Sequence, residues 1–131
     1  MIFLDSGYFI GIMDDRDNHH DEALKIKDFL IDSNESTVIN TTVIVETLNR
    51  SVGTKDDVEK IYNDLYSNNI VVSLTDEDYI KSLEVNGWYN NSINYSDCTI
   101  ITTMIDKGIS KIVSFDGGFE KIGNYEVISN L

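Results

Sequence analysis

The chain has 131 residues, 41% of them hydrophobic, and its 23 acidic and 10 basic side chains give a formal net charge of −13. This length fits one domain, residues 1–131, and the apolar content is enough for a packed core, which argues against a disordered chain. The single cysteine, Cys98, excludes an internal disulfide framework and a cysteine-based zinc site. The apolar runs are too short to span a bilayer and no secretory signal is recognisable, so we expect a soluble, cytoplasmic protein without membrane contact.

Short apolar runs alternate with stretches of helical periodicity. In chain order we expect a strand over 2–4, a helix over 21–31, a strand over 37–40, helices over 41–50 and 56–66, a strand over 70–73, helices over 75–88 and 96–107, and strands over 112–115 and 125–128. Strands separated by helices indicate βαβ units, and therefore an α/β fold with a parallel sheet of about five short strands flanked by helices.

Two of these helices carry recognisable start signals. Thr75 and Asp78 resemble a capping box, and the helix that follows places Tyr79, Ile80 and Leu83 along one side. Ser96 is expected to cap the helix over 96–107, which Gly108 would end.

Acidic residues follow the strands at positions where a functional crevice is expected. Asp5 comes directly after the strand over 2–4, and Asp116 directly after the strand over 112–115. Asp97 lies in the first turn of its helix, on the face that packs against the sheet, and Glu46 lies among apolar neighbours in the helix after the second strand. In parallel sheets ligands bind beyond the carboxyl ends of the strands, so these acids are the candidate site residues.

Each acid, taken alone, also has an ordinary structural explanation. Asp5 is a possible helix cap, Asp116 a turn residue, Asp97 a partner of the helix dipole, and Glu46 the acid of an exposed ion pair with Arg50. As a set, four acids at one sheet edge repel each other unless a cation lies between them. Hard oxygen ligands without cysteine or an obvious histidine pair favour Mg²⁺ or Mn²⁺.

Four segments resemble the PIN-domain family, especially the VapC-type ribonuclease toxins of toxin–antitoxin pairs. They are residues 2–6, with an aspartate and serine after the first strand; 39–46, leading to the glutamate; 95–100, with the third acid; and 108–119, with Ser-Phe-Asp before a phenylalanine. No segment by itself is specific for the family, but the four segments in this order and at this spacing are considerably more specific for it.

The resemblance implies a Rossmann-like PIN fold and an endoribonuclease that cuts RNA phosphodiesters through metal-activated water. By analogy Asp5, Glu46, Asp97 and Asp116 hold one or two Mg²⁺ or Mn²⁺ ions, with Ser6 and Ser114 in support. It also implies a homodimer and an antitoxin whose tail enters the active-site groove.

Several other residues are candidate contacts for RNA or metal. Arg50 is the first candidate for a phosphate contact, with an ion pair as its alternative. Tyr89 and the neighbouring tryptophan are candidates for stacking on bases, although a dimer contact or groove wall explains them equally well. His19 and His20 are adjacent and do not share a helix face, so we expect a structural or surface role.

The same pattern leaves three alternatives to a ribonuclease to be compared. The net charge of −13 repels RNA, which favours a non-catalytic PIN-like binding or scaffold module. A phosphatase of the haloacid-dehalogenase type requires Asp-x-Asp after the first strand, whereas this chain has Asp5-Ser6-Gly7. A phosphate-receiver domain requires a late lysine at the site, and Lys111 fits this requirement poorly.

Overall fold

The computed structural model describes residues 1–131 as one parallel sheet surrounded by helices. The elements in chain order are β1 (Ile2–Leu4), α1 (Ser6–Met13), α2 (His20–Ser33), β2 (Thr37–Asn40), α3 (Thr41–Asn49), α4 (Lys55–Asn68), β3 (Ile70–Val72), α5 (Asp76–Trp88), α6 (Tyr95–Lys107), β4 (Lys111–Val113), α7 (Gly118–Ile122) and β5 (Glu126–Ile128). All neighbouring strands are parallel, in the order β3-β2-β1-β4-β5. The predicted α/β fold with a five-stranded parallel sheet is confirmed.

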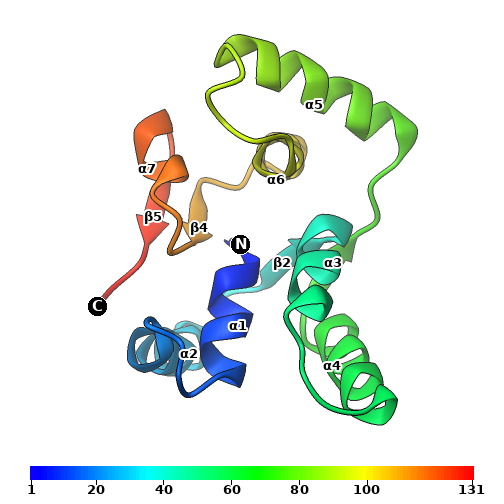
Figure 1. The fold of residues 1–131 in the computed structure, drawn as a ribbon. Coiled ribbons are helices and arrows are strands. Elements are labelled where there is room, and N and C mark those ends of the chain that lie inside the picture. The colour runs from blue at the N-terminus through cyan, green and yellow to red at the C-terminus, as the bar shows by residue number, and fades with distance from the viewer.

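Helices cover both faces of the sheet. Figure 1 shows α1, α2 and α4 on one side and α5, α6 and α7 on the other. The strand order explains this division, because the chain runs from β1 to β2 and β3 in one direction and then returns to β4 and β5 beyond β1. Right-handed crossovers in opposite directions place their helices on opposite faces. The direction reverses between β1 and β4, and in open α/β sheets such a switch point marks the functional crevice.

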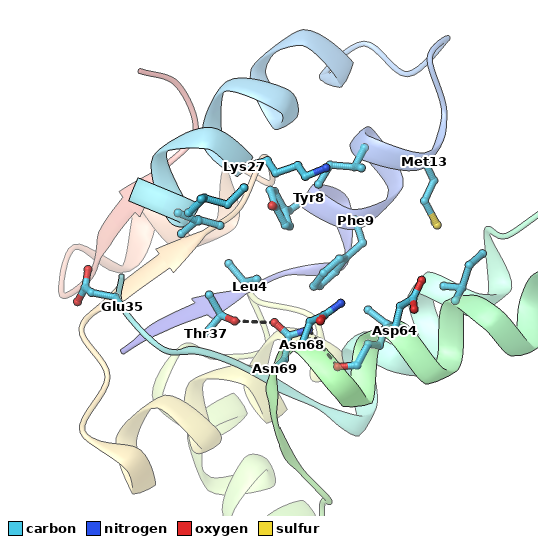
Figure 2. A pocket seen from close by; sticks show the side chains of 15 residues that line it. Leu4, Tyr8, Phe9, Met13, Lys27, Glu35, Thr37, Asp64, Asn68 and Asn69 are labelled. Atoms are coloured by element: carbon cyan, nitrogen blue, oxygen red, sulfur yellow. Dashed lines mark hydrogen bonds between the residues drawn. The ribbon is translucent and has the colours of Figure 1, made fainter. Parts of the chain in front are cut away.

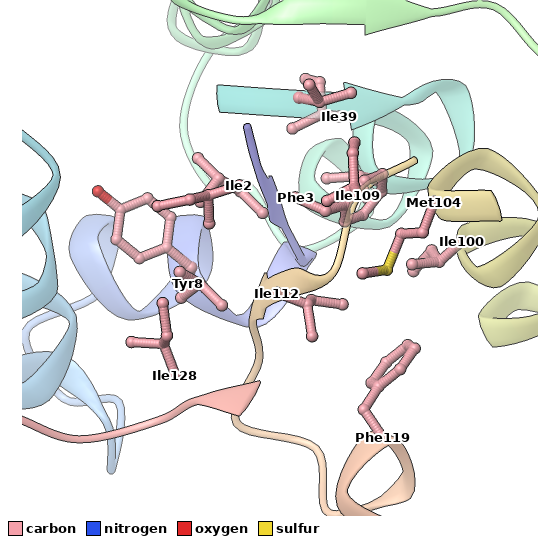
Figure 3. Packing of buried hydrophobic residues seen from close by; sticks show 14 of the residues in the cluster. Ile2, Phe3, Tyr8, Ile39, Ile100, Met104, Ile109, Ile112, Phe119 and Ile128 are labelled. Atoms are coloured by element: carbon pink, nitrogen blue, oxygen red, sulfur yellow. The ribbon is translucent and has the colours of Figure 1, made fainter. Parts of the chain in front are cut away.

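The core lies on both sides of the two central strands. β1 is buried along its full length, as expected for a strand covered on both faces. Figure 3 shows Tyr8 and Ile128 on one side of this layer and Met104 and Phe119 on the other. The site at the ends of β1 and β4 is therefore built on the most tightly enclosed part of the sheet.

Four features differ from the sequence prediction. β4 ends at Val113, two residues earlier than expected, and the helices α1 and α7 were not among the predicted elements. The predicted apolar side of α5 is exposed: Tyr79, Ile80 and Leu83 retain 41%, 66% and 63% of their accessible surface. The helix packs on α6 instead, and its buried Ser82 shares a hydrogen bond of 2.9 Å with the hydroxyl of a threonine there.

Asn40 connects the sheet to the helices around the site. It is fully buried at the end of β2, and its Oδ1 accepts a hydrogen bond from the backbone N–H of Val43 as the N-cap of α3. Its Nδ2 donates to Thr103 Oγ1 at 3.0 Å and to the carbonyl of Thr99 at 3.3 Å, both on α6. One amide therefore fixes β2, α3 and α6 relative to each other, and α3 and α6 carry two of the candidate acids.

Replacing Asn40 is expected to destabilise the fold. Asn40→Ala removes the cap of α3 and both hydrogen bonds that tie β2 to α6, so the free energy of unfolding should fall by about 2–4 kcal/mol. Urea denaturation followed by circular dichroism measures this change. The exposed Asn49→Ala serves as the control, and equal stability of the two variants would refute the role given to Asn40.

Candidate active site

Asp5 lies at the carboxyl end of β1 and is held by two fixed donors. It is buried, caps α1, and accepts a hydrogen bond at Oδ1 from the backbone N–H of Ser6 at 2.8 Å. Its Oδ2 accepts a hydrogen bond of 2.9 Å from the hydroxyl of Ser114, which follows the paired strand β4. The pairing of the two central strands thus sets the orientation of this carboxylate.

Asp97 lies in the first turn of α6, but the helix begins differently from the prediction. The expected cap at Ser96 is wrong, because Asn94 is the N-cap and its Oδ1 accepts a hydrogen bond from the backbone N–H of Asp97 at 2.9 Å. The capping signal was present in the sequence as Asn94-x-x-Asp97, and asparagine is a strong cap. Asp97 retains 8% of its accessible surface and is therefore a buried residue.

Glu46 and Asp116 approach the same region from two further elements. Glu46 projects from the middle of α3 and is half-buried. Asp116 follows β4 and is exposed, and its Oδ1 accepts a hydrogen bond from the backbone N–H of Gly118 at 3.0 Å. Its own N–H donates to Ser114 Oγ at 3.2 Å, so one serine hydroxyl joins Asp116 to Asp5.

The four acids lie close enough to alter each other's protonation. Burial, followed by the charges of Asp5, Asp116 and Glu46, raises the pKa of Asp97 to about 7. Burial also raises the pKa of Glu46, and the charges of Asp5 and Asp116 add to this effect. Residues from four separate segments of the chain thus form one electrostatic unit.

Asp5 responds to two opposing influences. Burial raises its pKa and outweighs the hydrogen bonds from Ser114 and the Ser6 backbone, which favour the charged form. The four acids do not form a complete metal site by themselves, because no group of three or more His, Cys, Asp or Glu side chains has the spacing needed to hold an ion. The donor set nevertheless suits a hard divalent cation, because all four members supply carboxylate oxygens.

Arg50 does not form the ion pair with Glu46 that was the alternative to its predicted phosphate contact. It ends α3, is exposed, and makes no salt bridge with Glu46. Instead it contributes with Arg16 and Lys60 to a surface hollow of about 610 Å³ that also contains acidic side chains. Its role as a phosphate contact stays a prediction.

The two histidines pack against neighbouring elements. The ring of His19 stacks on Phe115, with 4.4 Å between the centroids and 5° between the planes. Nδ1 of His20 lies 2.7 Å from the carbonyl of Gly11 and joins the start of α2 to α1. A Cβ at Gly11 would lie 3.0 Å from that of Ala23, so glycine permits the close approach of these helices.

The apolar cavity on the α1 side of the sheet lacks such a set of acids. A cavity of about 620 Å³ lies between α1, α2 and α4 and is lined mainly by apolar side chains such as Phe9 and Ile61 (Figure 2).

Lys111 lies at the start of β4, where its Nζ is 3.3 Å from Glu35 Oε2, at the opposite end of the strand from Asp116. It is thus not the lysine of a receiver-type site.

The family comparison agrees with this geometry. The sequence model of the PIN domain matches residues 2–125. The chain belongs to the PIN-domain family. This match includes all four acids and both serines, and it confirms the resemblance read from the sequence.

Solved structures show the same fold over nearly the whole chain. The VapC20 toxin of Mycobacterium tuberculosis, described as cleaving the sarcin–ricin loop, superposes with a TM-score of 0.80 at 24% identity, covering 98% of this chain and 99% of that one. VapBC2 of Rickettsia felis, bound to a DNA fragment from its promoter, gives 0.70 at 16% identity and 97% coverage of both chains. FitAcB of Neisseria gonorrhoeae gives 0.65 at 13% identity, covering 98% of this chain and 96% of that one. Among curated proteins the chain has no match.

The electrostatic strain at Asp97 predicts a specific dependence of stability on pH. Folding raises the pKa of Asp97 from its ordinary value of 3.8 to about 7. Protonation of Asp97 therefore stabilises the folded state fully below pH 3.8, and this stabilisation is lost as the pH rises through about 7. In EDTA, Asp97→Asn should therefore raise the melting temperature by about 3 °C or more at pH 8 and by much less at pH 4. Differential scanning calorimetry at both pH values measures the effect.

The exposed Asp32→Asn is the matched control, with the same change in melting temperature expected at both pH values. If Asp97→Asn also gives equal changes at pH 4 and pH 8, the repulsion among the four carboxylates is not a significant cost to the fold.

Proposed function

We propose that this PIN-domain protein is a Mg²⁺- or Mn²⁺-dependent endoribonuclease that hydrolyses RNA phosphodiester bonds. The observation that carries the proposal is the convergence of Asp5, Glu46, Asp97 and Asp116 at the switch point of the sheet, where burial and then the charges of the other three acids raise the pKa of Asp97 to about 7. Maintaining this repulsion costs stability, and a divalent cation among the carboxylates would offset that cost. The similarity to a toxin described as cleaving the sarcin–ricin loop supports RNA as the substrate.

The four carboxylates would hold the metal, and the neighbouring side chains prepare them for it. The Ser114 hydroxyl and the Ser6 backbone N–H orient Asp5, while the Asn94 cap fixes the backbone of Asp97. When bound, the ion would lower the pKa of a water molecule and stabilise negative charge on the phosphoryl oxygens. With a pKa of about 7, Asp97 gains or loses its proton near neutral pH, so binding a cation there requires the release of that proton.

We further propose that the protein is the toxin of a toxin–antitoxin pair. Two of its structural neighbours are named as complexes, VapBC2 and FitAcB. An antitoxin segment carrying a basic side chain would fit a site formed by four carboxylates, because opposite charges attract most strongly where water is excluded. Its RNA substrate would place the protein in the cytoplasm. No helix is both long and apolar enough to cross a membrane.

Cleavage of RNA tests the nuclease proposal directly. In Mg²⁺ or Mn²⁺ the wild-type protein should cut total RNA at discrete positions, and Asp5→Asn and Asp97→Asn should each lower the cleavage rate by at least about a hundredfold, because each loses a metal-binding charge. Sequencing of the RNA ends maps the cuts, and EDTA should abolish them. The exposed Asp32→Asn should cleave like the wild type.

A second measurement separates the nuclease from a scaffold. Isothermal titration calorimetry with Mn²⁺ should give binding that is lost in both site variants. Absence of both cleavage and metal binding in the folded wild type would overturn the proposal in favour of a non-catalytic PIN-like module.

We also propose a homodimer, with the outer side of α5 as part of its interface. Ile80 and Leu83 lie three residues apart on this helix, retain 66% and 63% of their accessible surface, and are joined there by Tyr79. In Figure 1 α5 lies on the outside of the molecule, with α6 between it and the sheet. Adjacent exposed apolar side chains of this size are typical of protein contact surfaces.

Introducing a charge on α5 should disrupt this dimer. Leu83→Glu and Ile80→Glu would each bury an unpaired carboxylate at the interface, so the dissociation constant should rise by at least about tenfold. Sedimentation velocity over a range of protein concentrations measures it. Val52→Glu, on a loop elsewhere, should leave the dimer intact, and a wild-type monomer at every concentration would contradict the proposal.

A further inference from the structure

A smaller cavity adjoins the candidate metal site. It has a volume of about 310 Å³, and two of the four acids, Asp97 and Asp116, form part of its wall. The rest of the lining comes from the segment between α5 and α6 and from α7. Small-molecule sites begin at about 300 Å³, so the cavity is large enough for one small ligand beside the carboxylates.

The lining combines an aromatic ring, a cation and neutral polar groups. Tyr89 supplies the aromatic surface, and Ser92 and Asn94 supply hydroxyl and amide groups. Lys121 is the only basic residue of the lining, is exposed, and takes part in no ion pair. An aromatic face, hydrogen-bonding groups and one free cation are the features that recognise a base, a ribose and a phosphate.

The wall that carries Tyr89 has an unusual and well-supported backbone. Asn90 and Asn91 both adopt left-handed conformations, with φ of 52° and 59°. Asn86 supports the turn, because its Nδ2 donates to Asn91 Oδ1 at 3.1 Å and to the carbonyl of Ile93 at 3.2 Å. Consecutive residues in this region of φ are uncommon outside glycine and concentrate at binding sites.

We propose that this cavity binds one nucleotide of the RNA next to the scissile phosphate, with Tyr89 stacking on its base and Lys121 contacting its phosphate. The inference rests on the proposed ribonuclease function and adds a determinant of base preference to it. The position of the cavity supports it, because a nucleotide held there lies directly beside Asp97 and Asp116. The local cation also addresses the net charge of −13, since it supplies positive charge where the RNA backbone must approach the acids.

Binding of mononucleotides tests the cavity separately from catalysis. A nucleoside 5′-monophosphate has no internucleotide bond, so its binding reports on the site whether or not the protein cleaves RNA. Titration of the full chain with each of the four monophosphates in Mg²⁺, followed by amide NMR, should shift residues 89–94 and Lys121 in a saturable way. Tyr89→Ala should weaken this binding by about fivefold or more, and Tyr89→Phe should retain it.

The cation has its own test and a matched control. Lys121→Ala should weaken binding of the monophosphates but not of the corresponding nucleosides, whereas Lys107→Ala, at the exposed end of α6, should change neither. Trp88→Ala is the aromatic control, since Trp88 adjoins Tyr89 in the sequence but does not line the cavity. Because Lys121 is exposed, its variant remains informative if Tyr89→Ala destabilises the fold.

Each outcome separates the two proposals. Saturable binding at the cavity, with neither cleavage of RNA nor binding of Mn²⁺, would overturn the nuclease and leave a nucleotide site. Cleavage of RNA without saturable shifts at residues 89–94 and Lys121, or equal losses in Trp88→Ala and Tyr89→Ala, would overturn the cavity inference alone.

Discussion

Repulsion among four carboxylates is the constraint on which the rest of the site depends. Burial and the neighbouring charges raise the pKa of Asp97 to about 7, so the fold keeps this acid where its charged form is disfavoured at neutral pH. Uncharged side chains at these positions would avoid this repulsion. The arrangement is maintained instead by directed hydrogen bonds, namely those of Ser114 and the Ser6 backbone to Asp5 and that of Asn94 to the backbone of Asp97. A site that costs stability and is held in place by specific donors is best explained by a ligand that offsets the cost.

The parallel sheet makes this concentration of charge possible. The reversal of strand order between β1 and β4 brings Asp5 and Asp116, separated by more than a hundred residues, to the same edge. The buried amide of Asn40 then connects β2 and α3 to α6, and these two helices bring Glu46 and Asp97 to that edge. The enclosed central strands thus supply stability. The four mutually repelling acids lie beyond the ends of these strands, where helices and loops leave room for a substrate.

The sequence predicted those parts of the molecule that depend on local pattern and fold class. Short apolar strands and ordered acids were sufficient for the parallel sheet and for the segments that carry the site. The cap of α6 was assigned to Ser96 rather than Asn94 because both residues are good caps and only the helix geometry decides between them. The exposure of Ile80 and Leu83 was not predictable, because apolar spacing on a helix does not distinguish a core face from a contact surface. The cavity beside Asp97 depends on loop conformation and on α7, neither of which has a periodic signal.

The net charge of −13 remains compatible with an RNA substrate when its distribution is considered. Long-range repulsion from exposed acids is screened beyond about 8 Å at physiological ionic strength, whereas contacts inside a partly enclosed site are screened much less. Binding of the proposed RNA substrate would therefore depend on the few cations near the carboxylates and on any metal held by them, more than on the overall charge. An acidic surface of this kind would also select against non-specific association with nucleic acid, since RNA that does not reach the metal gains little attraction elsewhere. The charge that argues against general RNA binding thus becomes a source of selectivity, provided that recognition is concentrated at the site between β1, β4 and α6.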